Sequence, residues 1–321
     1  MKIISLVRQK LNGVLLYREV IPHAYMVGRY DVHIHFRDNI LTITDEELET
    51  YDILHSSYSF MNDFQKERLK RLNVKLIIDV DDYWMVDRFH ELYNIYKEDD
   101  RTKIIRDIMR SADAITTTTS VLAEKIKPYC DKVGVFTNTL QKDDYSNNRV
   151  NEVPYMAWIG GGNHTADLML IQHLQKGIKV PVYVPENYRK VFRDRFLYYP
   201  GQSIPEYLGV YNHYDIILIS LRKSLFNSLK SPLKLMEAAF FRKPVIVSDV
   251  MPFSPYLKHK ENCLVVRKKS EWVKWSKMLI NDEAMRKELG ENLYKLVDEH
   301  FNIDKITKKR VDFYKSVINN T

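Results

Sequence analysis

The chain alternates short apolar, β-branched runs with stretches that have the spacing of amphipathic helices. In the first half, helical spacing covers 59–72, 100–111 and 120–127. The apolar runs between and around these stretches lie at 2–7, 32–36, 52–57, 74–79, 113–119 and 132–138. Strands that alternate with helices are typical of βαβ units, whose strands run parallel in one sheet. The first half therefore predicts an α/β domain with a parallel sheet.

A second series of the same kind follows a polar stretch without clear periodicity, 141–154, which we interpret as a linker. Its apolar runs lie at 155–160, 180–184, 196–201, 214–221, 244–249 and 262–266, with a helix over 232–242 and further helical sequence over 270–320. Two doubly wound domains that face each other would place the carboxyl ends of both sheets on one cleft, where such sheets bind ligands. We expect domains at 1–150 and 151–300, and a C-terminal helix, 301–321, that packs back towards the first domain.

Length and composition are those of a globular protein with two domains. The chain has 321 residues, of which 45% are hydrophobic and 28% charged, and two domains of about 150 residues each would divide it evenly. The cysteines, Cys130 and Cys263, form no CxxC or Cys/His cluster, which argues against a disulfide framework or zinc site and for a reducing compartment. The N-terminal apolar run is broken by Arg8 and Lys10, too early for a signal peptide or membrane span. We expect a cytoplasmic protein, free or peripheral to the inner face of a membrane.

The net charge of +7 favours anionic partners. Nucleotide phosphates, an anionic lipid surface and nucleic acid are all suitable anionic partners. A basic surface that binds no specific partner would have the same net charge. The predicted helix over 59–72 concentrates four cations that could contact an anionic membrane or an acceptor, Lys66, Arg68, Lys70 and Arg71. An ordinary amphipathic helix with a solvated basic face has the same pattern.

The sharpest local signal lies in the second half, in the stretch "NSLKSPLKLMEAAF". Ser231 is a good N-cap and Pro232 suits the first helical position, which predicts a helix start there. Lys230, Lys234 and Glu237 can then share one face. Two lysines beside free backbone N–H groups predict a diphosphate site, and one turn deeper Glu237 could accept hydrogen bonds from a ribose diol. A capped amphipathic helix with solvated lysines has the same pattern.

A second element that suits phosphate is "AWIGGGNHTADL", in which three glycines follow a strand and precede a helix start. Because glycine lets the backbone approach a ligand closely, Gly161, Gly162 and Asn163 are candidates for ligand contacts. Asn163 or Thr165 would cap the helix, and His164 is more typical of a turn than of a catalyst. The loop matches neither the GxGxxG fingerprint nor the Walker sequence, so by itself it is a weak motif.

Three aspartates end an apolar run of the first half, in "IDVDDYW". Asp79 and Asp81 have the spacing of haloacid-dehalogenase-type phosphatases, and the same pair could hold manganese through a sugar diphosphate. Asp82 and Tyr83 replace the Gly-Thr usual in those phosphatases, and a metal-dependent single-domain transferase would leave the second half unexplained. We favour a place on the cleft wall, where Asp81 and Asp82, with Trp84 nearby, bind acceptor hydroxyls or shape the wall while Asp79 is structural.

In their order along the chain, these segments resemble the group 1 glycosyltransferases of the GT-B fold, particularly short bacterial and phage-type members. The second half matches through "IGGGNHTADL", an Asp-Ile strand start at Asp215, and the Asn, Lys-Ser, Lys and Glu positions before a Pro-Val strand. The first half matches through "LNGVLLYREVIP", "LIIDVDDYW", "SADAITTTTSVLAEKI" and "VFTNTL". The specificity of the resemblance lies in the order of the segments rather than in any one of them.

The resemblance implies two Rossmann-like, doubly wound α/β domains that face each other across a cleft. It implies transfer of a sugar from a UDP- or GDP-type nucleotide sugar to an acceptor hydroxyl, with retention and without a metal or cofactor. The acceptor would be a glycan or glycolipid. The lysines and two helix N-termini would stabilise the departing diphosphate. The implied donor contacts are Gly161, Gly162, Asn163, His164, Arg222, Asn227, Lys230, Ser231, Lys234 and Glu237. The catalytic candidates of the first domain, chosen by position, are Asp81, Asp82 and His55, with His90 as a further histidine.

Departures from the family pattern leave two other functions open. Leu229 replaces a glutamate that usually touches the donor sugar, and Arg242 and Lys243 replace the glycine usual before the Pro-Val strand. A binding protein that has kept the fold but lost turnover would explain Leu229, although intact Lys230 and Lys234 argue against it. A DNA-modifying transferase would suit a short basic chain, although no base-reading motif is visible.

Overall fold

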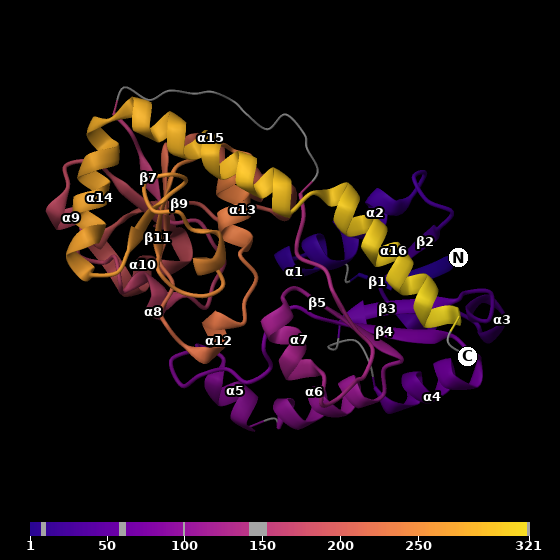
Figure 1. Ribbon diagram of the computed structural model, residues 1–321. Coiled ribbons are helices and arrows are strands. Elements are labelled where there is room, and N and C mark those ends of the chain that lie inside the picture. Colours follow the sequence, from indigo (N-terminus) through magenta and orange to yellow (C-terminus); the bar gives the residue numbers. More distant parts are fainter. Residues whose placement is uncertain (8–10, 58–61, 99, 141–152, 320–321) are drawn as a thin grey trace.

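The computed structural model describes residues 1–7, 11–57, 62–98, 100–140 and 153–319, which form two α/β units (Figure 1). Each unit contains a six-stranded sheet in which neighbouring strands run parallel. The strand orders are β2-β1-β3-β4-β5-β6 and β12-β11-β10-β7-β8-β9. The order reverses beside β1 in one sheet and beside β7 in the other, and open α/β sheets bind ligands at such switch points.

The first unit contains the six strands that the apolar runs predicted. Because parallel strands are covered by helices on both faces, they read as nearly continuous apolar runs. The strands are β1 (Lys2–Leu6), β2 (His33–Arg37), β3 (Ile53–Ser57), β4 (Lys75–Val80), β5 (Ala114–Thr117) and β6 (Val133–Val135). The helices are α1 (Gly13–Leu15), a π-helical turn at Leu16–Val20, α2 (Ile21–Met26), a 3₁₀ turn at Ile40–Thr42, α3 (Asp45–Leu48), α4 (Asp63–Arg71), α5 (Tyr93–Glu98), α6 (Arg101–Arg110) and α7 (Ser120–Ile126).

The second unit also has the six predicted strands, although the run at 155–160 forms only a two-residue strand. The strands are β7 (Met156–Ala157), β8 (Val182–Pro185), β9 (Leu197–Tyr199), β10 (Ile216–Ile219), β11 (Val245–Ser248) and β12 (Leu264–Val266). The α-helices are α8 (Thr165–Leu168), α9 (Leu174–Gly177), α10 (Arg189–Phe192), α11 (Ile204–Tyr207), α12 (Leu225–Ser228), α13 (Leu233–Phe240), α14 (Lys269–Asn281) and α15 (Glu283–His300). The 3₁₀ turns are Glu186–Tyr188, Arg193–Arg195, Leu208–His213 and Ser254–Tyr256. The predicted linker, 141–154, lies outside the described residues except at its last two positions.

Helix α16 (Ile303–Asn319) leaves the second unit and lies across the first (Figure 1). Helices α4, α6 and α7 cover one face of the first sheet, and α2 and α16 cover the other. On the α16 side, Val311, Tyr314 and Val317 pack in one buried cluster with Ile3 of β1 and Ile53 of β3. The core of the first unit therefore includes a helix that follows the whole second unit in sequence.

Candidate functional site

A cavity of about 640 Å³ opens between the two units. The first unit contributes residues that follow β1, β4 and β6, and the second contributes residues that follow β7, β8, β9 and β10 and the start of α13. Both switch points therefore face this cavity, as the doubly wound topology requires. The sequence-predicted residues that line it are Asp81, Asp82, Gly161, Gly162, Asn163, His164, Lys230, Ser231, Lys234 and Glu237.

Lys234 presents a cation to the cavity from the first turn of α13. Its Nζ atom donates to the carbonyl oxygen of Ile159 at 2.9 Å and lies 4.0 Å from the ring centre of Trp158. A Cβ atom on Gly160 would lie 2.0 Å from this Nζ, so the glycine leaves the space that the ammonium occupies. Burial lowers the pKa of Lys234 to about 8. A phosphate in the cavity would therefore meet a cation that little water shields.

The glycine loop after β7 is held open by hydrogen bonds from Tyr188. The Tyr188 hydroxyl donates to the carbonyl oxygen of Gly161 at 2.8 Å and accepts from the amide of His164 at 3.0 Å. Asn163 has a φ of 65°, a left-handed conformation that asparagine tolerates better than most residues. The predicted caps are wrong, because His164 is the N-cap of α8 and the hydroxyl of Thr165 donates to Glu91 instead.

Arg222 and Asn227 lie behind this loop and do not line the cavity. His164 Nδ1 is 2.7 Å from Asp167 Oδ2, and Asp167 Oδ1 accepts from the Arg222 amide at 2.7 Å and from Asn227 Nδ2 at 3.1 Å. Asp167 therefore accepts all three of these hydrogen bonds. His164 donates from Nδ1 and keeps Nε2 as an acceptor. Burial lowers the pKa of His164 to about 4, which keeps the ring neutral. A neutral acceptor suits a sugar hydroxyl better than a phosphate.

Asp81 and Asp82 follow β4 and form the opposite wall. Asp82 Oδ2 lies 2.9 Å from the Nζ atom of Lys230, an ion pair that joins the two units. Burial, together with the charges of Asp82 and Asp79, raises the pKa of Asp81 to about 7. Asp81 can therefore exist in both protonation states near neutral pH, which suits a group that exchanges a proton with a hydroxyl.

Asp79 is structural, as predicted. The Arg18 guanidinium donates to both of its carboxylate oxygens, at 2.7 and 2.9 Å, and Thr116 donates to it at 2.5 Å. Burial opposes the charge, but the Arg18 guanidinium, with smaller contributions from His55 and Arg310, outweighs burial and holds the pKa of Asp79 below its ordinary value. A carboxylate engaged in this way has no oxygen directed at a substrate, which removes the basis for the phosphatase and manganese alternatives.

Glu237 reaches the cavity, but tyrosines already occupy most of its acceptor capacity. Its Oε1 accepts from the hydroxyl of Tyr17 at 2.6 Å, and its Oε2 accepts from Tyr211 at 2.7 Å and Tyr207 at 3.3 Å. Burial raises the pKa of this carboxyl above its ordinary value, although all three hydroxyls stabilise the charge. A carboxylate offers about four acceptor positions and three are taken, so about one is left for a ribose hydroxyl, and the contact to a ribose stays a prediction.

Helix α13 begins one residue later than the sequence predicted. Pro232 is its N-cap, and the hydroxyl of Ser231 accepts a hydrogen bond from Nδ2 of Asn138, in the first unit, at 3.0 Å. Ser231 therefore contacts the first unit and does not cap the helix. The other predicted helix start, α8, is a single turn of four residues. Of the two N-termini expected to act on a diphosphate, α13 alone is long enough to contribute a helix dipole.

Leu229 and Trp84 both belong to the core rather than to the cavity wall. Leu229 is 4% exposed and packs in the hydrophobic cluster of the first unit, and its carbonyl oxygen accepts from the hydroxyl of Thr119. Trp84 is 2% exposed in the same cluster, with its ring edge-on to that of Tyr129. The expectation that Trp84 lies beside an acceptor is wrong. Leu229 serves to hold the two units together.

His55 does not reach the cavity, contrary to the expectation of a catalytic role. Its fully buried ring has Nδ1 2.7 Å from Glu19 and Nε2 3.2 Å from Thr116. His23 lies in the same cluster, with Nε2 3.0 Å from the hydroxyl of Tyr314 in α16. Because side chains alternate along β3, His55 points to the face that α16 covers. His90 lies in the loop before α5, against the ring of Phe226.

Three of the four predicted cations of the basic helix α4 form ion pairs, and its contact with a membrane or an acceptor stays a prediction. Arg68 and Arg71 both pair with Asp45, each at 2.6 Å, and Lys66 pairs with Asp63. Among the described residues, no helix combines the length and apolar character needed to cross a bilayer.

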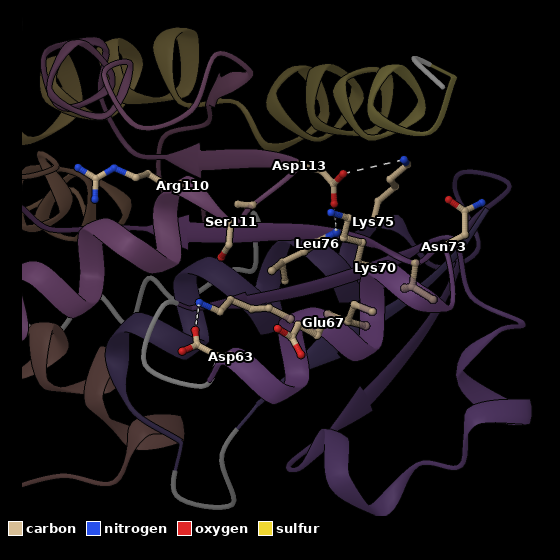
Figure 2. Close-up of a pocket in the computed structure, with 13 residues that line it drawn as sticks. Asp63, Glu67, Lys70, Asn73, Lys75, Leu76, Arg110, Ser111 and Asp113 are labelled. Carbon is tan, nitrogen blue, oxygen red and sulfur yellow. Dashed lines mark hydrogen bonds and ion pairs between the residues drawn. The ribbon is translucent and has the colours of Figure 1, made fainter.

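A second cavity, of about 590 Å³, lies between α4 and α6 over the start of β4, at the end of the first sheet opposite to the main cavity (Figure 2). Its lining mixes both signs of charge, and Lys75 lies 3.9 Å from Asp113 there. This mixture gives the second cavity no clear preference for an anion.

Part of the main cavity was not marked by any motif. The end of β9 contributes Tyr199, and the loops after β8 and β9 contribute Asn187, Gly201 and Gln202. These residues are scattered in sequence and belong to types that are common in ordinary loops, so only the strand order brings them together. Tyr17 stands in a segment that matched the family, but nothing in the sequence indicated its bond to a glutamate of the other unit.

No family model matches the chain, and no curated protein matches its sequence. Solved structures match nearly its whole length. HepE of Anabaena in complex with UDP-glucose matches with a TM-score of 0.71 and 10% identity, over 98% of this chain and 100% of that one. Sucrose-phosphate synthase from Thermosynechococcus elongatus matches with a TM-score of 0.72 and 14% identity, over 100% of both chains. An alpha-glucosyltransferase in complex with UDP and a 13-mer DNA containing a HMU base matches with a TM-score of 0.65 and 11% identity, over 98% of this chain and 99% of that one.

Identities of this size establish the fold alone. The two parallel sheets and their shared cavity agree with these matches, and the expected architecture is confirmed, whereas membership of group 1 stays a prediction. The chain has the GT-B fold, two Rossmann-like α/β units that face each other across a cleft.

Proposed function

We propose that the protein transfers a sugar from a nucleoside diphosphate to an acceptor hydroxyl. The observation that carries the proposal is a single cavity with two lysines and a glycine loop on one wall and two aspartates on the other. This arrangement suits a reaction in which an anionic leaving group departs on one side and a hydroxyl attacks from the other. HepE was solved with UDP-glucose and the alpha-glucosyltransferase with UDP, which favours a UDP-type donor.

The diphosphate would lie between Lys230, Lys234 and the start of α13. Preorganised cations that face a developing negative charge commonly contribute several kcal/mol to catalysis, and the helix dipole adds about 0.3–1 kcal/mol. Two fixed ammonium groups can neutralise the leaving diphosphate, so the proposal includes neither a metal nor a cofactor. The nucleoside would extend towards Glu237, the end of β9 at Tyr199 and the loop that carries Gln202.

The acceptor, a glycan or glycolipid in this proposal, would bind on the wall of the first unit. Asp81 would accept a hydrogen bond from the attacking hydroxyl, and with a pKa of about 7 its ionised form is present near neutral pH. Retention of configuration rests on the resemblance to retaining enzymes. In that account the leaving phosphate takes the acceptor proton on the same face of the sugar, and Asp81 orients the hydroxyl.

A thermal-shift panel of UDP, GDP, ADP and their sugars, with and without manganese, tests the donor site. A nucleotide at about 100 times its Kd should stabilise the fold by about 2.7 kcal/mol. Failure of every nucleotide to raise the transition would refute the donor site, and so would a shift of full size in the Lys234→Ala variant. Release of sugar from the donor in the absence of an acceptor separates an enzyme from a protein that only binds.

DNA is a second candidate acceptor. The match to an alpha-glucosyltransferase solved with DNA favours it, and so does the net charge of +7. Incubation with UDP-glucose and duplex DNA containing hydroxymethylated bases, followed by mass spectrometry of the nucleosides, decides the point. A glycosylated base would establish DNA as the acceptor, whereas unmodified DNA together with donor turnover on a saccharide would exclude it.

A further inference from the structure

The ion pair between Lys230 and Asp82 crosses the cavity at the place where a diphosphate would bind. Lys230 belongs to the second unit and Asp82 to the first, and their charged atoms are 2.9 Å apart. Both residues line the cavity, and their side chains are 20% and 38% exposed. The Lys230 ammonium also lies 4.6 Å from the ring centre of Phe226, which limits the directions in which it can turn.

The two lysines of the cavity differ in what they contact. Lys234 donates to the carbonyl oxygen of Ile159, a neutral group of its own unit, whereas the partner of Lys230 is a full negative charge from the opposite unit. A diphosphate that approaches Lys230 therefore meets a carboxylate already in place. Like charges at such distances repel strongly where water is partly excluded.

We propose that Asp82 acts as an internal substitute for the diphosphate and holds Lys230 until a nucleotide sugar displaces it. This inference rests on the proposed function and adds an order of events to it. The donor binds first and takes Lys230, and the freed Asp82 carboxylate then faces the acceptor side beside Asp81. Before the donor arrives, one of the two carboxylates of the acceptor wall is engaged, so the acceptor binds weakly.

A second ion pair between the units provides a matched control. Arg222 Nη2 lies 2.6 Å from Asp87 Oδ2, also across the units, and neither residue lines the cavity. Loss of that pair loosens the contact between the units without touching the diphosphate position. Asp82→Asn and Asp87→Asn each remove one negative charge and keep the size of the side chain. The two variants therefore differ mainly in the position of the removed charge, which lies in the cavity for Asp82 and outside it for Asp87.

The test measures the Kd of UDP and GDP by calorimetry for the full chain and its variants. We expect Asp82→Asn to bind the nucleotide about twofold to fivefold more tightly, the range set by partly exposed ion pairs, and Asp87→Asn to bind it as the wild-type protein does. In a Lys230→Met background, Asp82→Asn should give no gain, because the lysine for which the two anions compete is gone. Melting curves of each variant establish that it is folded.

Three outcomes would overturn the inference. Equal nucleotide affinity of Asp82→Asn and the wild-type protein means that Asp82 does not compete with the nucleotide for Lys230. A gain of the same size in the Lys230→Met background means that Asp82 only repels the nucleotide and does not occupy the lysine. A similar gain from Asp87→Asn means that looser contact between the units is the cause. Absence of nucleotide binding by the wild-type protein would instead refute the proposed function itself.

Discussion

Substitution of Gly160 by alanine tests the diphosphate site from a residue that carries no charge. The added Cβ would lie 2.0 Å from the Nζ atom of Lys234 and 2.6 Å from the nearest ring atom of Trp158. Trp158 is fully buried and cannot move easily, whereas the lysine side chain is flexible at its end. The ammonium therefore leaves the Ile159 carbonyl and its place at the cavity.

The magnitude follows from what the displaced ammonium would have contributed. A hydrogen bond to a charged group is worth about 1.5–3 kcal/mol, so the Kd of the nucleotide should rise about 10- to 150-fold. Overlap with the Trp158 ring should lower the free energy of unfolding by about 1–3 kcal/mol as well. Urea denaturation measures the second effect and calorimetry with UDP the first, so the two can be separated.

Gly161→Ala is the matched control, because a Cβ at that position meets no protein atom within 4 Å. It changes the same loop and should leave the stability unchanged. In a Lys234→Ala background, Gly160→Ala should weaken nucleotide binding no further. Binding of the nucleotide by Gly160→Ala as tightly as by the wild-type protein would contradict this role of the Lys234 ammonium. An effect of Gly160→Ala on binding that persists when Lys234 is absent would contradict it as well.

Other predictions concern the acceptor wall and the contacts that hold the fold. Because only the ionised form of Asp81 can accept the hydrogen bond that orients the attacking hydroxyl, and its pKa is about 7, kcat should rise from pH 6 to pH 8, and Asp81→Asn should remove that rise. Tyr17→Phe leaves one donor fewer for the buried Glu237 and should lower the free energy of unfolding by about 1–3 kcal/mol in urea titrations. Gly290→Ala places a Cβ 2.0 Å from the backbone oxygen of Arg242, so α15 must shift and Tm should fall by several degrees, whereas an unchanged Tm would contradict the packing described for this helix.

The elements of the fold could be predicted because each depends on a local pattern. The run "LIID" is apolar on both faces and so reads as the buried parallel strand β4, and "SVLAEKI" has the spacing of the helix α7. The parallel direction of the strands followed from the alternation of strands and helices, which is typical of βαβ units. The placement of Lys230 and Lys234 on one wall of the cavity could be predicted for the same reason, because the two lysines are close in sequence.

Contacts between distant segments could not be predicted. Ser231 looked like a helix cap because its local sequence is typical of one, but the Asn138 side chain of the other unit competes for the hydroxyl. Glu237 looked available for a ribose because the tyrosines that donate to it lie far from it in sequence, Tyr17 in the first unit and Tyr207 and Tyr211 in an earlier segment of the second. His55 looked like a cleft residue because its strand ends there, and only the position of α16 shows that its face of the sheet is covered.

The return of α16 makes the first domain discontinuous in sequence. During synthesis, the face of the first sheet that carries Ile3 and Ile53 stays uncovered until residues 303–319 have emerged, whereas every strand of the second sheet is complete by Val266. We therefore expect the later half of the chain to finish folding before the earlier half, the reverse of the usual N-terminal-first order. In the interval, an apolar β-surface awaits its covering helix, and this nascent state is the one in which chaperones or aggregation would act.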